Sequence, residues 1–474
     1  MEYALLRRWP EYDRPMRLRF LGGETAERFT RELSDSLDGV LRYNFHYEEP
    51  DRGFVTASIE GRFFWDVLWT RDAGVFLREL VCYGYLGSAA LLAERLIALC
   101  GKNAAGFHAF PTMLRPREPA AGDEVDGTAA ILVGMAMLCR KLRALGDEAA
   151  DAYAGRLRAC VSAPDAPLGY LLFALEQAGL VAGEGEFGGG LGVHGLWYNV
   201  VQNGLVRNAL RLWADVLAEE QAGVALSRRC ADAADRLQET LCRVFAGPDG
   251  WYFCVGPDRK PDETVLHAQA NRGFAGVNGV LAMAADADGF ALPDGPLYAA
   301  GRRTFFTLLN EPQRRRWFDR YGIYIQFDQI AHGLLSSPSY GQGYALQCAL
   351  LLDEPQLAGK LLDYLVTATA QPPAAYRLTR TPEHRYWFYE RFLLPEYFEL
   401  PPAQQEHDEG CGALNLVNVA EPLKCARLLA GFAGDGAERP LLPRLPAGFT
   451  ACRIENAGVV RNGRLRFETI DVRG

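Results

Sequence analysis

The sequence predicts a mainly α protein built as an (α/α)6 toroid, a ring of six helical hairpins around a central cavity. From Ala73 onward, apolar residues recur at three- and four-residue spacing, which is the period of an amphipathic helix. The helical stretches come in pairs, and about a dozen of them across about 400 residues are what six hairpins require. No fixed sequence period is present, which argues against a regular solenoid. A plain helical bundle or a superhelix of hairpins remains the alternative.

Three regions differ in texture along the chain. Residues 1–60 are expected to be extended, because their segments are rich in aromatic and β-branched residues. Residues 61–435 are expected to form the toroid. Residues 436–474 are expected to form a small β appendage, in which Asn462-Gly463 is a favoured hairpin turn. Within the toroid the expected helices span residues 73–86, 88–101, 127–144, 148–160, 197–219, 224–246, 270–285, 296–309, 340–352, 355–369 and 412–431.

Composition excludes several classes of protein. The 474 residues are 49% apolar and 23% charged, the usage of an ordinary globular protein. The net charge of −9 includes no basic block, so neither a nucleic-acid nor a membrane partner is expected. The first residues hold no signal-peptide core, and the longest apolar run, Ala129–Leu138, is too short to span a bilayer. Eleven scattered cysteines without a C-x-x-C pair indicate buried free thiols. We therefore expect a cytoplasmic protein. The sequence does not decide between a monomer and a homo-oligomer.

The densest group of chemically active residues lies where the extended region gives way to the first helix. Residues 60–72 hold two tryptophans, two arginines and three carboxylates. Aromatic faces contact the C–H surface of a sugar ring, while Arg and Asp grip its hydroxyls. The segment therefore predicts a carbohydrate site, with a helix-capping role for its last Asp as the alternative. The candidates are Glu60, Trp65, Trp69, Arg71 and Asp72.

Further expected helix starts carry candidate residues. Glu124 and Asp126 come just before the strongly apolar helix, where acidic residues are also ordinary partners of the helix dipole. His194 and Trp197 follow a glycine-rich loop whose spacing does not match a phosphate-binding motif. A satisfied core His beside a core Trp is the alternative there. Tyr340, which begins a later expected helix, is added to the substrate-binding candidates.

A last candidate carboxylate, Glu390, follows four consecutive aromatic residues that include Trp387. An apolar, ring-lined setting raises a carboxyl pKa, as acid–base catalysis requires. A surface carboxylate beside core aromatics is the alternative. The seven histidines show no H-E-x-x-H spacing, so neither a metal nor a cofactor is expected.

Several of these motifs carry a resemblance to known families. Residues 69–72, Trp-Thr-Arg-Asp, resemble the W-T-R-D element of glucoamylase-type enzymes, whose Arg-Asp pair holds the terminal sugar. Residues 126–129 are similar to their D-G-P-A element. Residues 412–431 are similar to the late helix of bacterial α-L-rhamnosidases. Both families are six-hairpin glycosidases, so the resemblance implies an (α/α)6 barrel and the hydrolysis of glycosides.

The resemblance also implies roles for single residues. In the rhamnosidases a W-E motif before the late helix supplies the catalytic base, and Glu390 matches it best. Their general acid lies twelve residues before the Asp of a W-x-x-D element, and counting back from Asp72 gives Glu60. Glu60 stands where those enzymes have Asp and lacks the Cys-Pro that follows it there. The mid-chain Trp197-Tyr198-Asn199 lacks the carboxylate that glucoamylases use as acid.

The function expected is that of an exo-acting glycoside hydrolase that acts on a carbohydrate substrate. One carboxylic acid would protonate the leaving oxygen, and a second carboxylate would activate water or attack carbon. Glu390 is the expected base, and Asp126 and Glu60 compete for the role of acid. Asp72 and Arg71 are expected to grip hydroxyls. Both related families invert configuration, which favours inversion here.

Three other functions stay open at this stage. A sugar epimerase or isomerase on the same barrel would use histidines, of which the sequence offers His194, His267, His332 and His384. A uronate-specific hydrolase or lyase would use arginines, such as those at positions 62, 71 and 391. A non-catalytic sugar-binding or interaction protein would need no convergence of the carboxylates.

Overall fold

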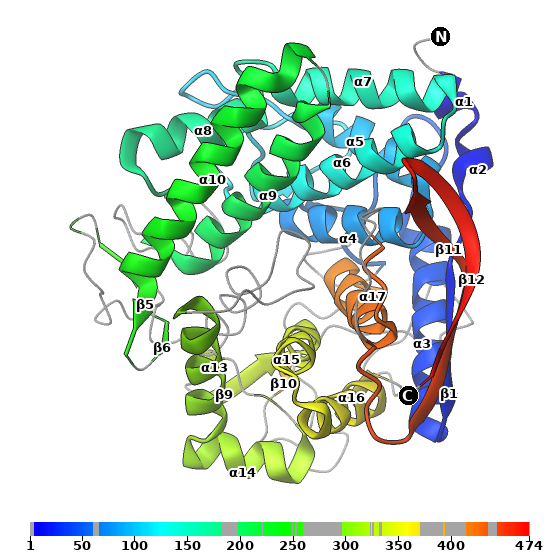
Figure 1. Ribbon diagram of the computed structural model, residues 1–474, viewed down its shortest axis with the longest axis vertical. Coiled ribbons are helices and arrows are strands. Elements are labelled where there is room, and N and C mark those ends of the chain that lie inside the picture. The colour runs from blue at the N-terminus through cyan, green and yellow to red at the C-terminus, as the bar shows by residue number, and fades with distance from the viewer. Residues whose placement is uncertain are drawn as a thin grey trace.

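The structure is a computed structural model that describes residues 4–59, 66–182, 198–219, 221–248, 250–251, 254–256, 258, 296–322, 324, 327–330, 334–369, 392–393, 414–434 and 443–473. Helices dominate these residues, short strands lie at the helix connections, and one long antiparallel hairpin runs along a side of the molecule (Figure 1). The helices are arranged in an inner and an outer layer.

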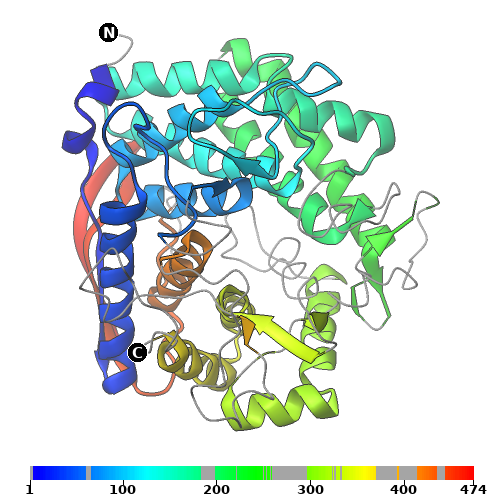
Figure 2. The same ribbon diagram turned by 180° about the vertical axis from the view of Figure 1, so that it is seen from behind.

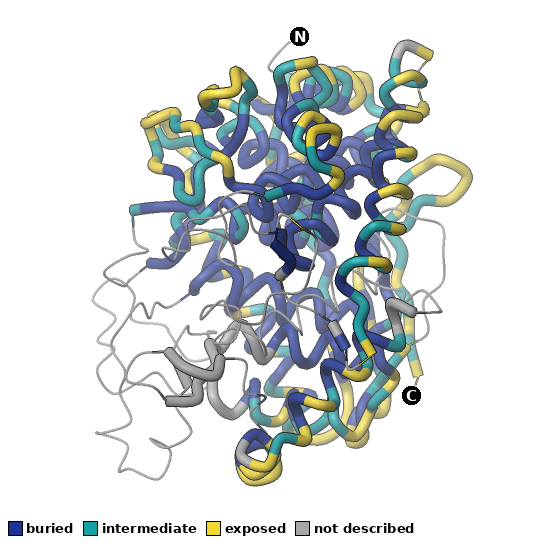
Figure 3. Tube along the Cα trace, turned by 90° about the vertical axis from the view of Figure 1, so that its left-hand side faces the viewer, coloured by how far each residue is buried: buried dark blue, intermediate teal, exposed yellow. Residues whose placement is uncertain are grey.

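Five of the described helices form the inner layer, each packed against the next. In spatial order they are α9 (Val200–Ala218), α6 (Asp126–Ala144), α4 (Thr70–Cys82), α17 (Leu416–Ala430) and α15 (Ser339–Leu351). Most residues of α4, α6, α9 and α17 are buried. Figure 3 shows buried residues, in dark blue, throughout the interior of the molecule. A helix buried all round must lie between other helices. The apolar run Ala129–Leu138 lies in α6 and is wholly buried, as predicted.

An outer helix covers each of these inner helices. The pairs are α10 (Val224–Phe245) on α9, α7 (Glu148–Ser162) on α6, α5 (Leu86–Leu99) on α4, α3 (Glu24–Gly39) on α17 and α16 (Pro355–Thr369) on α15. An outer helix buries only one stripe: in α10 the buried residues Cys230, Leu237, Leu241 and Phe245 recur at helical spacing. Two layers of alternating helices are the (α/α)6 arrangement, so the predicted fold class is confirmed.

The predicted hairpins of the first half correspond to α4 with α5, α6 with α7, and α9 with α10. The expected helix at 296–309 is α13 (Pro296–Leu309). Within residues 61–435, two of the described helices were not predicted, namely α8 (Pro167–Ala178) and α14 (Pro312–Tyr321). Both start with Pro at the first helical position, a residue that is equally common in turns. The expected helix at 270–285 lies outside the described residues.

The N-terminal region is only partly extended, so this prediction is wrong for Glu24–Gly39, which forms helix α3. Its buried residues Ala26, Phe29, Leu33 and Leu37 lie on one face at three- and four-residue spacing. This face packs against α16, α17 and strand β1, and its helical period was obscured by the aromatic and β-branched segments that flank it. Figure 2 shows α3 in dark blue, running beside the C-terminal hairpin.

The β appendage predicted at the C-terminus is present as a three-stranded antiparallel sheet. Strands β11 (Phe449–Arg461) and β12 (Arg464–Arg473) form a long hairpin. The turn between them holds Asn462 and Gly463, both with positive φ, as the favoured two-residue turn requires. The third strand, β1 (Arg17–Gly22), comes from the N-terminal region and pairs with β11. The sheet therefore joins the two ends of the chain.

No helix within the described ranges combines the length and the apolar character that a membrane crossing requires. The described cysteines are free, and most of them are buried, as the sequence predicted for this part of the chain.

Close contact between α4 and α6 depends on glycine. A Cβ atom on Gly74 would lie 2.5 Å from the backbone of Ala130 and Ile131. We expect Gly74→Ala to lower the free energy of unfolding by about 1–3 kcal/mol, because the helices must move apart. In α7 a Cβ on Gly155 would meet only the end of the Arg158 side chain, at 3.8 Å. Gly155→Ala should therefore stabilise by about 0.5–1 kcal/mol. Urea unfolding of both variants measures these changes. Equal changes in the free energy of unfolding would contradict a special role of Gly74 in the contact between α4 and α6.

Candidate active site

The first turns of α4 and α6 lie side by side at one end of the inner layer. A Cβ atom on Gly127 would lie 2.5 Å from Thr70 Oγ1 and 3.0 Å from the backbone nitrogen of Arg71. Only glycine permits this approach. The Thr70 hydroxyl bonds to the carbonyl oxygens of Pro111 at 2.9 Å and Thr112 at 3.1 Å. The start of α4 is thereby fixed to the loop that leads into α6.

Asp72 is a buried carboxyl group in the first turn of α4, with 4% of its surface exposed. The Arg71 guanidinium lies 3.9 Å from its carboxyl oxygen. Burial raises the pKa of Asp72 to about 6; Arg71 opposes this shift, while Glu421 and Asp126 add to it. A carboxyl group with such a pKa exchanges its proton near neutral pH, which is the property that acid–base catalysis uses.

Glu124 and Asp126 place two more buried carboxyl groups at the start of α6. The Thr112 hydroxyl donates to Glu124 Oε2 at 2.9 Å. Burial, and then the adjacent Asp126, raise the pKa of Glu124 well above its usual range, so Glu124 is protonated at neutral pH. Asp126 accepts the backbone N–H of Gly127 through Oδ1 at 3.0 Å. The proton on Glu124 allows both carboxyl groups to be buried together without two opposing charges.

A set of buried polar side chains, here called the floor network, lies deeper in the inner layer than Asp72. Arg78 follows Asp72 by six residues, which is about 9 Å along the axis of α4. Its Nη2 donates to Glu421 Oε1 on α17 at 3.3 Å. The amide of Gln347 on α15 donates to the other oxygen of Glu421. Three inner helices therefore hold one carboxylate between them.

The floor network continues to a second carboxylate. Arg427 donates to both oxygens of Glu79, at 2.8 and 2.6 Å, and neither side chain is exposed. Arg78 also donates to Glu79, at 2.7 Å. Burial alone would raise the pKa of Glu79, but Arg427 and Arg78 outweigh it and hold the pKa below its ordinary value. Burial lowers the pKa of the adjacent Lys424 to about 8. The network is thus a compact set of nearly balanced charges.

The structure brings together five of the predicted site residues and leaves the others undescribed. Trp69, Arg71, Asp72, Glu124 and Asp126 lie at the joined ends of α4 and α6. Outside the described residues lie Glu60, Trp65, His194, Trp197, Trp387 and Glu390. The backbone of Tyr340 is in the first turn of α15, but its side chain is not described.

The segment that follows Glu390 in sequence is described. Phe392 and Leu393 form strand β10, which pairs with Pro338 and Ser337 at the end of strand β9 (Leu334–Pro338). Strand β9 runs directly into α15, the helix that carries Gln347. The assignment of Glu390 as the base stays a prediction.

Sequence reasoning gave no role to Glu421, Gln347 or Tyr344. Tyr344 on α15 is buried, and burial, followed by the charge of Glu421, raises the pKa of its hydroxyl. A signal for Glu421 was available: it is a carboxylate inside an otherwise apolar helix, and such a group is buried only with partners. The identity of those partners was not available, because they lie on helices far away in sequence.

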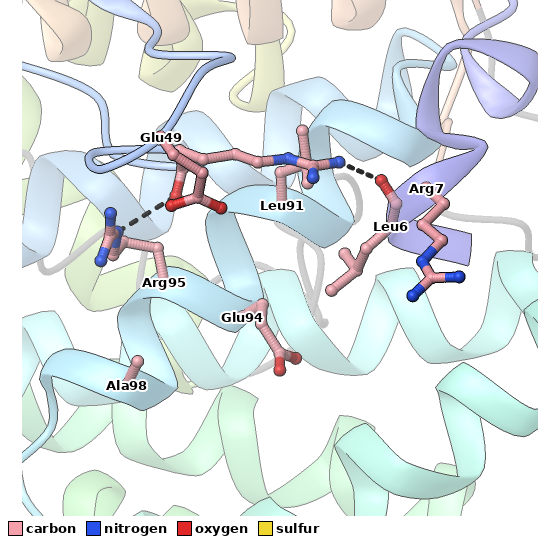
Figure 4. Close-up of a pocket in the computed structure, with 8 residues that line it drawn as sticks. Leu6, Arg7, Glu49, Leu91, Glu94, Arg95 and Ala98 are labelled. Carbon is pink, nitrogen blue, oxygen red and sulfur yellow. Dashed lines mark hydrogen bonds between the residues drawn. The ribbon is translucent and has the colours of Figure 1, made fainter. Parts of the chain in front are cut away.

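A separate pocket of about 320 Å³ lies between α1 (Ala4–Arg7) and α5, away from these carboxyl groups. Figure 4 shows Arg7 and Arg95 at its two ends and Glu94 between them. Arg95 donates to the backbone oxygen of Arg52 at 3.1 Å. No predicted site residue lines this pocket, and Arg95 on α5 bonds to the backbone of the loop at residues 50–52. Within the described ranges, no group of three or more His, Cys, Asp or Glu is placed to hold a metal ion.

Rings of alternating inner and outer helices with this connectivity are the fold of the six-hairpin glycosidases. No protein-family model matches the chain, and no curated protein matches it in sequence. Solved structures do match it. A structure described as a wild-type glycosidase superposes with a TM-score of 0.57 at 12% identity, over 85% of this chain and 97% of that one.

Two further solved structures give the same result. A variant glycosidase in complex with glucose superposes with a TM-score of 0.56 at 12% identity, over 85% of this chain and 96% of that one. The glucoamylase of Hormoconis resinae gives 0.53 at 11% identity, over 94% and 80%. Such low identities establish the fold alone. At that level the resemblance to six-hairpin glycosidases is confirmed.

Proposed function

We propose that the protein is an exo-acting glycoside hydrolase that cleaves a terminal sugar with inversion of configuration. The observation that carries the proposal is the group of buried carboxyl groups, Asp72, Glu124 and Asp126, at the joined ends of α4 and α6. Hydrolysis of a glycoside needs one carboxylic acid and one carboxylate in different protonation states. The raised pKa of Asp72 and of Glu124 fits this requirement. The likeness to solved glycosidases supports the same class of reaction.

The roles proposed for single residues follow from this geometry and from the sequence motifs. Asp126 or Glu60 protonates the leaving oxygen, and Glu390 activates the attacking water. Arg71 and Asp72 hold hydroxyls of the terminal sugar through charge-assisted hydrogen bonds. The burial of Asp72 suits a chain end, which can enter a closed ring, better than an internal unit of a polysaccharide. Inversion requires the acid and the base to lie about 6.5–9.5 Å apart.

The proposal is tested with aryl glycosides, aryl uronides and free sugars, in wild type and in Glu390→Gln. α-Glucosides come first, since the similar structures include a glycosidase with glucose and a glucoamylase. We expect release of the aryl group from at least one glycoside and a loss of about 10²–10⁴-fold in kcat/KM in the variant. Glu383→Gln, in the same segment, is the matched control. Proton NMR of the first sugar released should show the inverted anomer.

Other outcomes of the same assay would overturn the proposal. Isomerisation of a free sugar without cleavage would indicate an epimerase, and an unsaturated product from a uronide would indicate a lyase. Wild-type turnover by Glu390→Gln would remove Glu390 from the mechanism. Retention of configuration would leave a hydrolase but reject inversion.

A further inference from the structure

Two buried carboxyl groups in direct contact are unusual in a protein interior, because two carboxylates repel each other there. Glu124 and Asp126 are such a pair, with 2% and 0% of their surface exposed. Their carboxyl groups are joined by a hydrogen bond. Two ionised carboxyl groups have no hydrogen to donate, so this bond requires one proton between them. The pair therefore carries one proton and one negative charge.

The bonds around the pair decide where this proton lies. The Thr112 hydroxyl donates to Oε2 of Glu124 at 2.9 Å, which leaves the other oxygen of Glu124 to carry the proton. Oδ1 of Asp126 accepts the backbone N–H of Gly127 at 3.0 Å. Oδ2 of Asp126 is buried but accepts no N–H or hydroxyl group of the described residues. The proton of Glu124 gives Oδ2 the donor that it lacks.

The backbone holds Glu124 in this orientation. Its N–H donates to the carbonyl oxygen of Phe110 at 3.1 Å, and its carbonyl oxygen accepts the Thr128 hydroxyl. Phe110 and Thr112 belong to the loop that the Thr70 hydroxyl fixes to the start of α4. The same loop therefore orients the Glu124 carboxyl group and joins it to α4.

The negative charge of the pair lies next to Arg71 and Asp72. A Cβ atom on Gly127 would lie 3.0 Å from the backbone nitrogen of Arg71, so the two helix starts are in contact at this point. The charged groups with the largest effect on Glu124 are Asp126 and Arg71. Asp126 in turn helps to raise the pKa of Asp72. Asp126 is fully buried and both of its oxygens are engaged, so it acts on this region through its charge.

We propose that Glu124 is a positioning residue that holds one proton against Asp126, so that the pair presents a single negative charge beside Asp72. The inference rests on the proposed function for the reaction that this charge serves. A fixed negative charge near the sugar stabilises the positive charge that develops on the ring in the transition state. Asp126 is then not the acid, which leaves Glu60 as the candidate for that role.

The shared proton is tested by thermal unfolding, without any substrate. Glu124→Gln places an amide N–H where the acid proton lies, and this N–H does not ionise. Burial and Asp126 raise the pKa of Glu124 in the folded state far above its unfolded value of about 4.3. The folded wild type therefore binds one more proton than the unfolded chain, and its stability falls as pH rises toward the folded pKa. The advantage of Glu124→Gln in melting temperature should grow by about 2–3 °C from pH 7 to pH 9.

The size of this growth decides the outcome. A difference in melting temperature that stays constant from pH 7 to pH 9 would show that Glu124 is ionised throughout, and the proposal would fall. The growth should be smaller when the same comparison is made in an Asp126→Asn background, because the neighbouring charge is then absent. Equal growth in both backgrounds would attribute the proton on Glu124 to burial alone and would also reject the pair.

The positioning role is tested by kinetics on an aryl glycoside that wild type cleaves. Glu124→Gln should keep kcat within about 3-fold of wild type, since its amide still donates to Asp126. Glu124→Leu removes the donor and should lose about 10–100-fold in kcat with a smaller change in KM. Equal losses in the two variants would show that the donor is irrelevant and would reject the role.

A matched pair of threonine variants adds a control. Thr112→Val removes the hydroxyl that orients the Glu124 carboxyl group and should lower kcat about 10-fold. Thr128→Val removes a hydroxyl that bonds only to the backbone of Glu124 and should leave kcat unchanged. Equal effects of the two substitutions would contradict an orienting role of Thr112.

The two measurements also separate this inference from the proposed function. A difference in melting temperature that grows with pH, in a protein that cleaves no glycoside, would keep the shared proton and reject the hydrolase. Cleavage by a protein in which this difference is constant would keep the hydrolase and reject the shared proton.

Discussion

Arg427→Met should lower the free energy of unfolding by about 3–5 kcal/mol, which would be a large fraction of the stability of a typical protein. The Arg427 side chain is fully buried and donates to both oxygens of Glu79, which is equally buried. Its removal leaves Glu79 with the single hydrogen bond from Arg78. A buried carboxylate that has lost its main partner destabilises the folded state, because its loss of hydration is no longer compensated. Urea unfolding at neutral pH measures the loss.

Two controls separate the buried charge from other effects of the substitution. Replacing both partners, in Glu79→Leu with Arg427→Met, removes the unpaired charge and should recover much of the loss. Arg315→Ala breaks an ion pair with Asp319 in which both side chains are about half exposed, and should cost no more than about 1 kcal/mol. A loss below about 1 kcal/mol in Arg427→Met would show that the floor network is not a source of stability.

The inner helices of the fold could be predicted because their pattern is local. In α6 the run Ala129–Leu138 leaves no polar face, and only a position between other helices explains it. Helix α3 carried its own local signal in Phe29, Leu33 and Leu37, which the β-rich flanking segments obscured. The pairing of β1 with β11 could not be predicted, since it joins residues at opposite ends of the chain and no local pattern links them.

In the candidate site, too, residues with a local sequence signal could be predicted, and contacts between residues distant in sequence could not. Asp72 and Asp126 stand at helix starts beside recognisable motifs, and the structure places them together. The partners of Glu421 come from α4 and α15, at positions 78 and 347, and no sequence pattern links them. The exposed fraction of Asp72, and hence its pKa, depends on this three-dimensional packing. The roles of Glu60 and Glu390 depend on resemblance and stay predictions.

Asp72→Asn should stabilise the protein at neutral pH while it weakens the action on sugars. The folded-state pKa of Asp72, about 6, lies above the unfolded value of about 4. The folded state therefore binds more protons between these values, and the contribution of Asp72 to stability is lost as pH rises from about 4 to 6. Removing the ionisable group should abolish this loss. The variant should gain up to about 2–3 kcal/mol at pH 7 relative to wild type.

The pH dependence is what makes this prediction specific to the charge on Asp72. Urea unfolding of wild type and Asp72→Asn at pH 4.5 and pH 7.5 gives the difference in the free energy of unfolding between the two proteins at each pH. Contacts that do not depend on ionisation contribute equally at both pH values, so only the charge on Asp72 changes this difference. That difference should grow toward pH 7.5; a difference that is constant with pH would mean that Asp72 titrates normally. Binding or cleavage of glycosides should fall about 10–100-fold in the same variant, because a charged hydrogen-bond partner is lost. A gain in stability together with a loss of function is the signature of a buried carboxylate kept for chemistry, since packing alone would select the amide.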